Sequence, residues 1–272
     1  MLRLMRALFG FLLLALAAPL AAADDRPIVD DRGQKKEDRA RRELPTLWIA
    51  GDSTVKSNGA LRGWGQEIGA FFDPAKINVV NRAIGGRSSR TFYTEGRWNE
   101  ILGQIRQGDF VVIQFGHNDV GPTDARSKFR GSVKGIGDET EEVEKPDGTL
   151  ETVHSYGWYL KEYARTAKAK GATVILCSPV PHKRFDRNGH YTGDWEDWAR
   201  WVGACAKEEQ VEFIDLAKLI GKKYERLGLE KVEPLFADKG THTTAEGAKL
   251  NAEILVEALK KLPGKPLRRS FN

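Results

Sequence analysis

Three short motifs, widely separated in the sequence, carry the side chains that acyl transfer requires. Gly51-Asp52-Ser53-Thr54 contains a candidate nucleophile, Gly116-His117-Asn118-Asp119 contains an amide donor, and Asp238-Lys239-Gly240-Thr241-His242 contains an imidazole with an acidic neighbour. A serine hydroxyl is a weak nucleophile at neutral pH, so it needs an imidazole to accept its proton and preset donors to bind the oxyanion. If one fold brings the three motifs together, these residue types fit a serine hydrolase.

Short apolar runs alternate with helix-length segments along most of the chain. The runs, which we interpret as strands, are Leu47–Ala50, Ile77–Val80, Phe110–Ile113, Ala172–Leu176 and Val211–Ile214. Apolar positions at helical spacing occur near 62–73, 96–106, 154–170, 194–209, 217–228 and 245–262. Strands that read as continuous apolar runs between helices are typical of parallel sheets. The pattern therefore predicts a three-layer α/β/α sandwich with a central parallel sheet of about five strands.

The candidate residues fall where such a sheet places its ligands. Ser53 follows the first predicted strand, Gly86 follows the second and Asn118 follows the third. Ligands of open α/β sheets gather beyond the carboxyl ends of the strands, so these residues should share one edge. His242 precedes the last predicted helix, in a loop that can return to the same edge.

Three donors can form an oxyanion hole at that edge. They are the backbone N–H groups of Ser53 and Gly86 and the side-chain amide of Asn118. Gly85 is an alternative to Gly86, because a tight turn after the second strand would use either glycine. Each motif taken alone also fits a plain turn.

Taken together and in order, the motifs resemble the SGNH, or GDSL, hydrolase superfamily, and in detail its rhamnogalacturonan acetylesterase branch. The resemblance rests on Ala50-Gly51-Asp52-Ser53-Thr54, Gly63-Trp64-Gly65, Asn81 with Gly85-Gly86-Arg87-Ser88, Gln114-Phe115-Gly116-His117-Asn118-Asp119, and His242-Thr243 with Gly247-Ala248. It spans most of the chain after residue 44. It implies a flavodoxin-like SGNH fold, Ser53 as nucleophile, His242 as base, and Gly86 rather than Gly85 as donor.

The acidic member of the implied triad departs from the family pattern. The family carboxylate usually stands three residues before the histidine, but Lys239 occupies that position and Asp238 stands four before His242. Two arrangements follow. Either the loop accommodates one extra residue and Asp238 reaches the ring, which we favour, or a backbone carbonyl orients the ring of a serine–histidine pair.

The chain divides into four segments. Arg3 and Arg6 precede an apolar run that ends in Ala21-Ala22-Ala23, a pattern that predicts a signal peptide over residues 1–23. A charged, flexible leader is expected over residues 24–44, a hydrolase domain over 45–262 and a tail over 263–272. Export without a membrane anchor is expected, to a periplasm or to the outside of the cell; the alternative is a short N-terminal anchor helix that is never cleaved. Cleavage would lower the formal charge from +5 to about +3.

Substrate contacts are assigned to Arg87, His117 and Trp195. Arg87 could meet uronate carboxylates, His117 adjoins Asn118, and Trp195 lies where an aromatic face could stack on a sugar. Trp198 and Trp201 share the spacing of Trp195 but are expected to pack into the core. Residues 120–153 form a long polar insertion that is either a rim over the site or a solvated loop.

The leading interpretation is a secreted carbohydrate acetylesterase, most simply of rhamnogalacturonan, that acts as a monomer on acetylated polysaccharide or oligosaccharide. The alternatives are a lipolytic member of the superfamily, such as a lysophospholipase or thioesterase, and a non-catalytic carbohydrate-binding protein. No metal, cofactor or nucleic acid is expected, because ligand spacings such as His-Glu-x-x-His and sustained basic stripes are missing from the sequence. Cys177 and Cys205 are expected to be buried free thiols.

Overall fold

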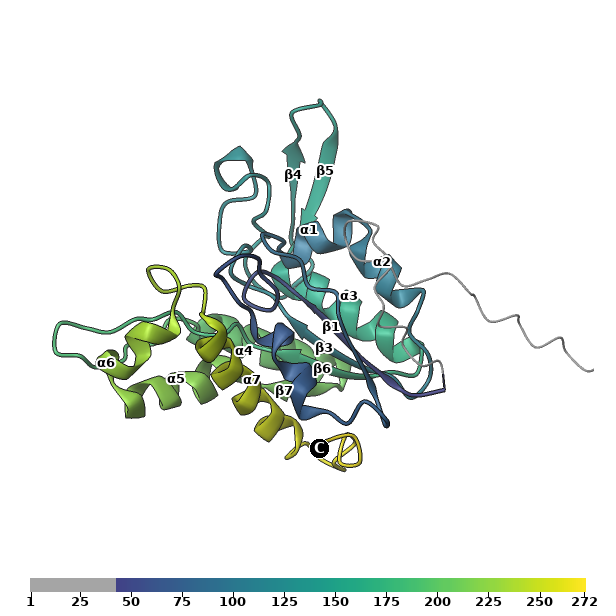
Figure 1. The fold of residues 1–272 in the computed structure, drawn as a ribbon. Helices are drawn as coiled ribbons and strands as arrows, with labels where there is room; N and C mark the ends of the chain where they lie inside the picture. The colour runs from purple at the N-terminus through teal and green to yellow at the C-terminus, as the bar shows by residue number, and fades with distance from the viewer. Residues whose placement is uncertain (1–42) are drawn as a thin grey trace, which may run out of the picture.

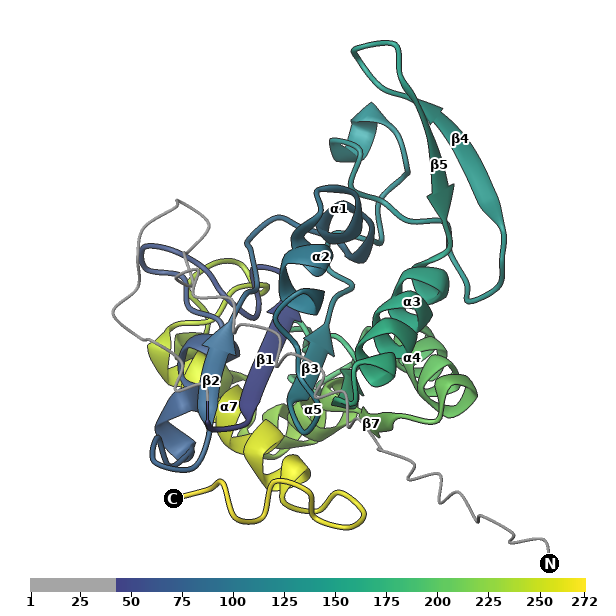
Figure 2. The ribbon, with the colours of Figure 1, turned by 90° about the vertical axis from the view of Figure 1, so that its right-hand side faces the viewer.

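A parallel five-stranded sheet forms the centre of the computed structural model, which describes residues 43–272. Its strands are β1 (Thr46–Gly51), β2 (Asn78–Asn81), β3 (Phe110–Gln114), β6 (Thr173–Cys177) and β7 (Glu212–Ile214), in the order β2-β1-β3-β6-β7 (Figures 1 and 2). Each strand overlaps one of the predicted apolar runs, and the predicted sandwich is confirmed. The predicted signal peptide and all but the last two residues of the predicted leader lie outside the described residues.

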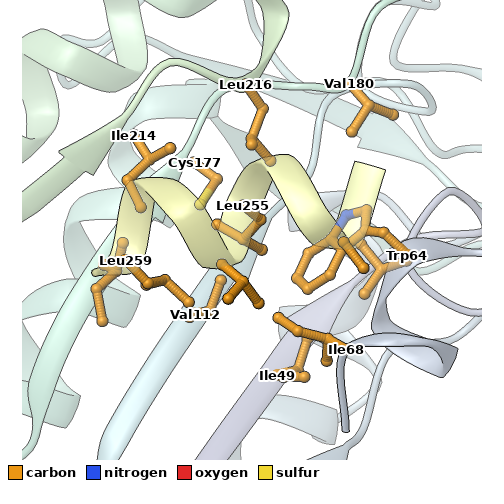
Figure 3. Close-up of a cluster of buried hydrophobic side chains, with 14 of the residues drawn as sticks. Ile49, Trp64, Ile68, Val112, Cys177, Val180, Ile214, Leu216, Leu255 and Leu259 are labelled. Carbon is orange, nitrogen blue, oxygen red and sulfur yellow. The ribbon is translucent and has the colours of Figure 1, made fainter. Parts of the chain in front are cut away.

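Both faces of the sheet are buried, which explains why its strands read as continuous apolar runs. In β1, Leu47 and Ile49 enter one core while Trp48 and Ala50 enter the other. Helices α5 (Leu216–Leu227) and α7 (Ala245–Leu259) cover the first face, and Figure 3 shows Leu255 and Leu259 of α7 among sheet residues such as Val112. The second face packs against α1 (Ser89–Thr94), α2 (Arg97–Leu102), α3 (Tyr156–Ala169) and α4 (Glu196–Glu209).

The helix predicted near 62–73 forms two short 3₁₀ turns instead, η1 (Trp64–Gln66) and η2 (Ile68–Phe71). The reason lies in where its backbone donors go. Trp64 N–H donates to the carbonyl of Thr54 and Gly65 N–H to that of Val55, so the segment is bonded to the loop after β1. A Cβ atom at position 63 would lie 2.2 Å from the carbonyl carbon of Val55, so only glycine fits this approach.

The polar insertion over residues 120–153 is ordered and contains elements that the sequence pattern did not reveal. After η3 (Ala125–Ser127), strands β4 (Thr140–Glu144) and β5 (Leu150–His154) form an antiparallel hairpin that extends away from the main sheet (Figures 1 and 2). The buried side chain of Arg90 anchors the insertion. Its Nη1 donates to the carbonyls of Thr123 and Gly131, at 2.7 Å each, and its Nε donates to Glu151 Oε1 at 2.7 Å.

The last ten residues, predicted as a tail, pack onto the domain. Leu267 is fully buried, and the ring of Phe271 lies 4.8 Å from that of Phe72, centroid to centroid. Asp73 N–H donates to the carbonyl of Ser270 at 2.9 Å. Two short elements, α6 (Leu229–Val232) and η4 (Glu233–Leu235), precede the loop that leads into α7.

The predictions of free cysteines and of no membrane anchor can be compared with residues 43–272. Cys177 and Cys205 are free and buried, and they lie in the cores on opposite faces of the sheet, so the sheet separates them. Burial raises the pKa of the Cys205 thiol to about 12. Among the described helices, none combines the length and the apolar character that a membrane span needs.

Candidate active site

Ser53, His242 and Asp238 form a hydrogen-bonded relay at the carboxyl edge of the sheet. Ser53 Oγ lies 2.8 Å from His242 Nε2, and His242 Nδ1 lies 2.6 Å from Asp238 Oδ2. Ser53 follows β1, whereas the other two residues lie in the loop before α7, so the fold joins positions 189 residues apart. The geometry allows the imidazole to take the hydroxyl proton while the carboxylate fixes the ring tautomer.

Asp238 reaches the ring in spite of its four-residue separation from His242, because its two oxygens have different partners. Oδ1 accepts the backbone N–H groups of Gly240, Thr241 and His242 at 2.9, 2.7 and 3.0 Å, and Oδ2 faces the ring. Gly240, between the two residues, has φ = +147°, a conformation that favours glycine. Of the two arrangements considered from the sequence, the structure contains the one with the carboxylate.

The same contacts keep Asp238 ionised. Burial raises the pKa of Asp238, but the N–H of Gly240, the His242 ring and the N–H groups of His242 and Thr241 outweigh it, so the pKa lies well below its ordinary value of 3.8. The side chains of His242 and Asp238 retain 24% and 35% of their exposure, so the relay opens to solvent on one side. A substrate can therefore approach Ser53 from that side.

Buried polar contacts shape the loop that presents Ser53. Asp52 is fully buried, and its Oδ1 accepts both the N–H and the hydroxyl of Thr54, at 2.8 and 2.7 Å. Gln114, at the end of β3, receives Trp64 Nε1–H at 2.8 Å and donates its Nε2–H to Thr54 Oγ1 at 3.0 Å. These contacts tie the 3₁₀ turns and β3 to the residue that follows the nucleophile. They account for Trp64 and Gln114, which the sequence analysis quoted without a role.

Backbone donors near Ser53 have no acceptor of their own. Within residues 43–272, the N–H groups of Ser53, Gly85 and Gly86 donate to no protein atom. Gly85 and Gly86 form the corner of a turn that the Arg87 N–H closes onto the carbonyl of Ile84, and Gly86 has φ = +78°. A Cβ atom on Gly85 would lie 3.6 Å from Ser53 Cβ, so this turn lies directly against the nucleophile. A glycine-built turn with a free N–H suits an oxyanion hole.

The side chain of Asn118, the third predicted donor, lies between a hydrogen-bond acceptor and a hydrogen-bond donor. Its Nδ2 donates to the carbonyl of Arg87 at 3.0 Å, and its Oδ1 accepts from Arg130 Nη1 at 2.8 Å. One N–H of the amide remains without an acceptor in the described part of the chain. No sequence motif pointed to Arg130, because it lies in the polar insertion, 12 residues from its partner and outside every motif.

Asp119, next to Asn118, fastens the loop after β3 to its surroundings. Its carboxylate is fully buried and accepts from the N–H and hydroxyl of Ser89, at the start of α1, and from the hydroxyl of Ser132 in the insertion. Burial raises the pKa of Asp119 to about 6, although the hydroxyls of Ser132 and Ser89 act in the other direction. These contacts give Asp119 a positioning role in the loop.

The predicted substrate-binding residues differ in accessibility. Arg87 is about one-third exposed and pairs with Glu95 at 3.0 Å. Trp195 is only 4% exposed, and the His117 side chain is equally buried. Their ring centroids lie 4.9 Å apart, and the ring of Trp195 stacks on His182. His117 and Trp195 are thus largely enclosed by aromatic neighbours, and their contact with substrate stays a prediction.

His117 and Asp52 form a second imidazole–carboxylate pair behind the nucleophile, with His117 Nδ1 3.5 Å from Asp52 Oδ2. Burial alone would raise the pKa of Asp52. The charge and hydrogen bond of His117 and the two donors of Thr54 together outweigh burial, so the pKa lies below its ordinary value. No group of three or more histidine, cysteine or acidic side chains among residues 43–272 has the arrangement of a metal site.

Comparisons with known proteins agree on one family. Residues 49–250 match the GDSL-like Lipase/Acylhydrolase family. The chain is 35% identical over 233 residues to the probable rhamnogalacturonan acetylesterase YesY of Bacillus subtilis strain 168, covering 83% of this chain and 96% of that protein. It is 33% identical over 214 residues to the rhamnogalacturonan acetylesterase of Emericella nidulans, covering 79% of this chain and 84% of that protein.

Solved structures with the same fold include the crystal structure of protein YxiM from Bacillus subtilis. It superposes with a TM-score of 0.64 at 28% identity, over 80% of this chain and 56% of that chain. An acetylxylan esterase from Geobacillus stearothermophilus superposes with a TM-score of 0.51 at 18% identity, over 80% of this chain and 93% of that chain, and shares the fold alone.

Proposed function

Because the chain belongs to the GDSL-like lipase/acylhydrolase family, in which it is a carboxylic ester hydrolase, we propose that it removes acetyl groups from rhamnogalacturonan through an acyl-enzyme on Ser53. The observation that carries the proposal is the relay of 2.8 Å and 2.6 Å contacts from Ser53 through His242 to Asp238. Two relatives that carry the name rhamnogalacturonan acetylesterase, and cover most of this chain, support the choice of substrate.

The proposed reaction proceeds by two acyl transfers. His242 Nε2 takes the Ser53 proton as Oγ attacks the acetyl carbonyl, and it returns that proton to the departing sugar hydroxyl. A water then attacks the acetyl-serine with His242 again as base, and acetate leaves. Asp238 remains ionised throughout and stabilises the imidazolium that forms in each step.

Three donors stabilise the negative charge that develops on the carbonyl oxygen: the N–H groups of Ser53 and Gly86 and the free N–H of Asn118. Each is fixed before the substrate arrives, which is what makes such donors effective. Loss of one of them typically costs about 3 kcal/mol of transition-state stabilisation.

We further propose that the insertion over residues 120–153 borders a groove for polymer, that Arg87 contacts the substrate, and that the protein is exported after cleavage near residue 23. The solvent-facing side of the relay and the polar character of the insertion support an open site. An acyl channel for lipids would instead be lined by apolar side chains.

Acetate release from acetylated rhamnogalacturonan, acetylated xylan and p-nitrophenyl esters of two to twelve carbons tests the proposal. We expect the highest kcat/KM on acetylated rhamnogalacturonan, with activity on synthetic esters falling as the acyl chain lengthens. Ser53→Ala should lose at least about 10⁴-fold in kcat on each substrate. Preference for long acyl chains would favour a lipolytic enzyme, and preference for xylan would reassign the substrate while leaving the mechanism intact.

A further inference from the structure

The cation of Arg130 lies against the oxyanion hole with no carboxylate to neutralise it. Among residues 43–272, Arg130 forms no ion pair, and its Nη1 is 2.8 Å from Asn118 Oδ1. The same nitrogen is 3.8 Å from the position that a Cβ atom on Gly86 would occupy. The guanidinium therefore adjoins two of the three donors assigned to the oxyanion. Most other arginines of the insertion and its neighbourhood, such as Arg126 and Arg90, are paired with carboxylates.

The polarity of its neighbours fixes the orientation of the Asn118 amide. A guanidinium only donates, so it requires the oxygen of the amide, and the carbonyl of Arg87 only accepts, so it requires the nitrogen. With both partners in place, the remaining N–H of Asn118 must point away from Arg87, where it can serve the oxyanion. The positive charge of the Arg130 guanidinium beside Oδ1 also polarises the amide and makes its N–H a stronger donor.

The backbone before Arg130 is held in a conformation that residues with side chains rarely adopt. Lys128 and Phe129 both have φ = +59°, in the left-handed region. Such strain persists only where surrounding contacts impose it, and it gathers at functional sites. Here Ser127 supplies the contacts: its hydroxyl accepts the N–H groups of Arg130 and Gly131 at 3.1 Å each, and its carbonyl accepts Arg130 Nε–H at 3.0 Å.

We propose that Arg130 is a positioning residue for ester hydrolysis, which orients and polarises the Asn118 amide so that its free N–H meets the oxyanion. The inference rests on the proposed role of Asn118 and extends it to a residue of the insertion. It also assigns the insertion a task beyond bordering the substrate: the insertion supplies the group that completes the oxyanion hole.

A double-mutant cycle tests this assignment, with p-nitrophenyl acetate as a small neutral substrate. Arg130→Met should lower kcat about tenfold in the native background with little change in KM, since an oriented donor acts on the transition state. In the Asn118→Ala background the same substitution should change kcat less than about twofold, because its target is gone. Arg130→Lys, which keeps a cationic donor, should recover part of the loss.

Arg126→Met is the matched control, since Arg126 lies in the same insertion but is 77% exposed and pairs with Asp124. It should leave kcat unchanged. Thermal unfolding of every variant shows whether the loop still folds. If Arg130→Met does not fold, the Arg130→Lys variant and its double with Asn118→Ala complete the same cycle.

Three results would overturn the inference. An equal loss from Arg130→Met with and without Asn118 would mean that the cation acts on the oxyanion directly or only holds the loop. A loss confined to acetylated galacturonate-containing oligosaccharides, and seen in KM, would make Arg130 a ligand for the substrate carboxylate. An unchanged kcat in Arg130→Met would exclude any such role. If Asn118→Ala itself leaves kcat unchanged, the proposed oxyanion hole fails as well, and the two failures can be told apart.

Discussion

The Asp238 carboxylate both stabilises the loop before α7 and orients the His242 ring. One carboxylate oxygen binds three consecutive backbone donors, and the other holds His242 Nδ1 at 2.6 Å. The first oxygen makes the four-residue spacing workable, and the second sets the tautomer. A carboxylate at position 239 is therefore not needed, and a lysine can stand there.

Replacement of Asp238 by Asn should reduce turnover strongly while leaving substrate binding in place. The amide would present its N–H₂ to His242 Nδ1, which moves the ring proton to Nε2, where it blocks acceptance of the Ser53 proton. We expect kcat to fall about 10³- to 10⁴-fold with KM nearly unchanged. Steady-state kinetics on p-nitrophenyl acetate measure this, and a loss below about tenfold would mean that the carboxylate is dispensable.

The low pKa of Asp238 also predicts a pH-dependent contribution to stability. Because the folded-state pKa lies below the unfolded value of 3.8, the contribution is present above that pH and is lost as the pH falls through the folded-state pKa. Denaturant unfolding should therefore show Asp238→Asn to be less stable than the native protein at pH 7, with a gap that narrows below pH 3.8.

Asp197→Asn serves as the control for this pH experiment, because Asp197 lies on an exposed part of α4. It should change the free energy of unfolding little at either pH. A gap between native protein and Asp238→Asn that stays constant from pH 7 to pH 3 would contradict the linkage.

At the scale of elements, the ends of β1 and β3 and the turn after β2 define the site. Gly51 closes β1 where space is tight: a Cβ atom there would lie 2.4 Å from Val55 Cγ2 and 2.7 Å from the carbonyl oxygen of Gln114. The loop that carries Ser53 can cross β3 at this distance only because residue 51 has no side chain.

Gly51→Ala should therefore displace the nucleophile loop as well as strain the core. We expect a loss of about 1–3 kcal/mol in the free energy of unfolding together with a lower kcat. Gly69→Ala is the matched control, since a Cβ at that position in η2 meets no atom within 4 Å. Chemical denaturation and kinetics of both variants measure the difference, and equal behaviour would show that the close approach is unimportant.

The sequence predicted the elements that are buried on both sides better than those that are not. All five strands of the main sheet could be located, because each contains apolar residues in a short run, continuous in β1 and β3 and interrupted by polar residues in β2 and β7. The β4–β5 hairpin was not predicted, because its strands are largely exposed and each buries a single valine, Val143 or Val153. The 3₁₀ turns near Trp64 were mistaken for a helix, since their spacing is helical but their donors bind the Ser53 loop.

The candidate site was predictable to the extent that local motifs carry it. Ser53, Gly86, Asn118 and His242 follow strands or precede a helix within recognisable strings, and the structure brings them to one edge. Arg130 carries no such signal, because its relation to Asn118 depends on how the insertion folds back. The burial of Trp195 was also out of reach, since helical spacing does not tell which face meets His117 and His182.

At the scale of the whole molecule, two cores on opposite faces of one sheet support the edge on which the relay lies. The C-terminal residues belong to the first of these cores. Leu267 is fully buried there, next to Leu259 at the end of α7 and Leu262 just after it.

Leu267→Ala tests whether the last ten residues contribute to the stability of the domain. A buried leucine truncated to alanine typically lowers the free energy of unfolding by about 2–5 kcal/mol. Leu150→Ala is the control, because Leu150 is 70% exposed in the hairpin and should cost little. Urea denaturation measures both, and a loss below about 1 kcal/mol for Leu267→Ala would mean that this segment packs loosely in solution.

The central claim is that Ser53 alone carries the acyl group, driven by His242. Labelling with an organophosphate ester such as paraoxon, followed by mass spectrometry of peptides, tests it most directly. We predict one adduct per chain, located on Ser53 and formed in step with loss of esterase activity, with none on Ser53→Ala and far slower labelling of His242→Ala. Full esterase activity in a protein whose Ser53 is completely modified, or in Ser53→Ala, would contradict the account.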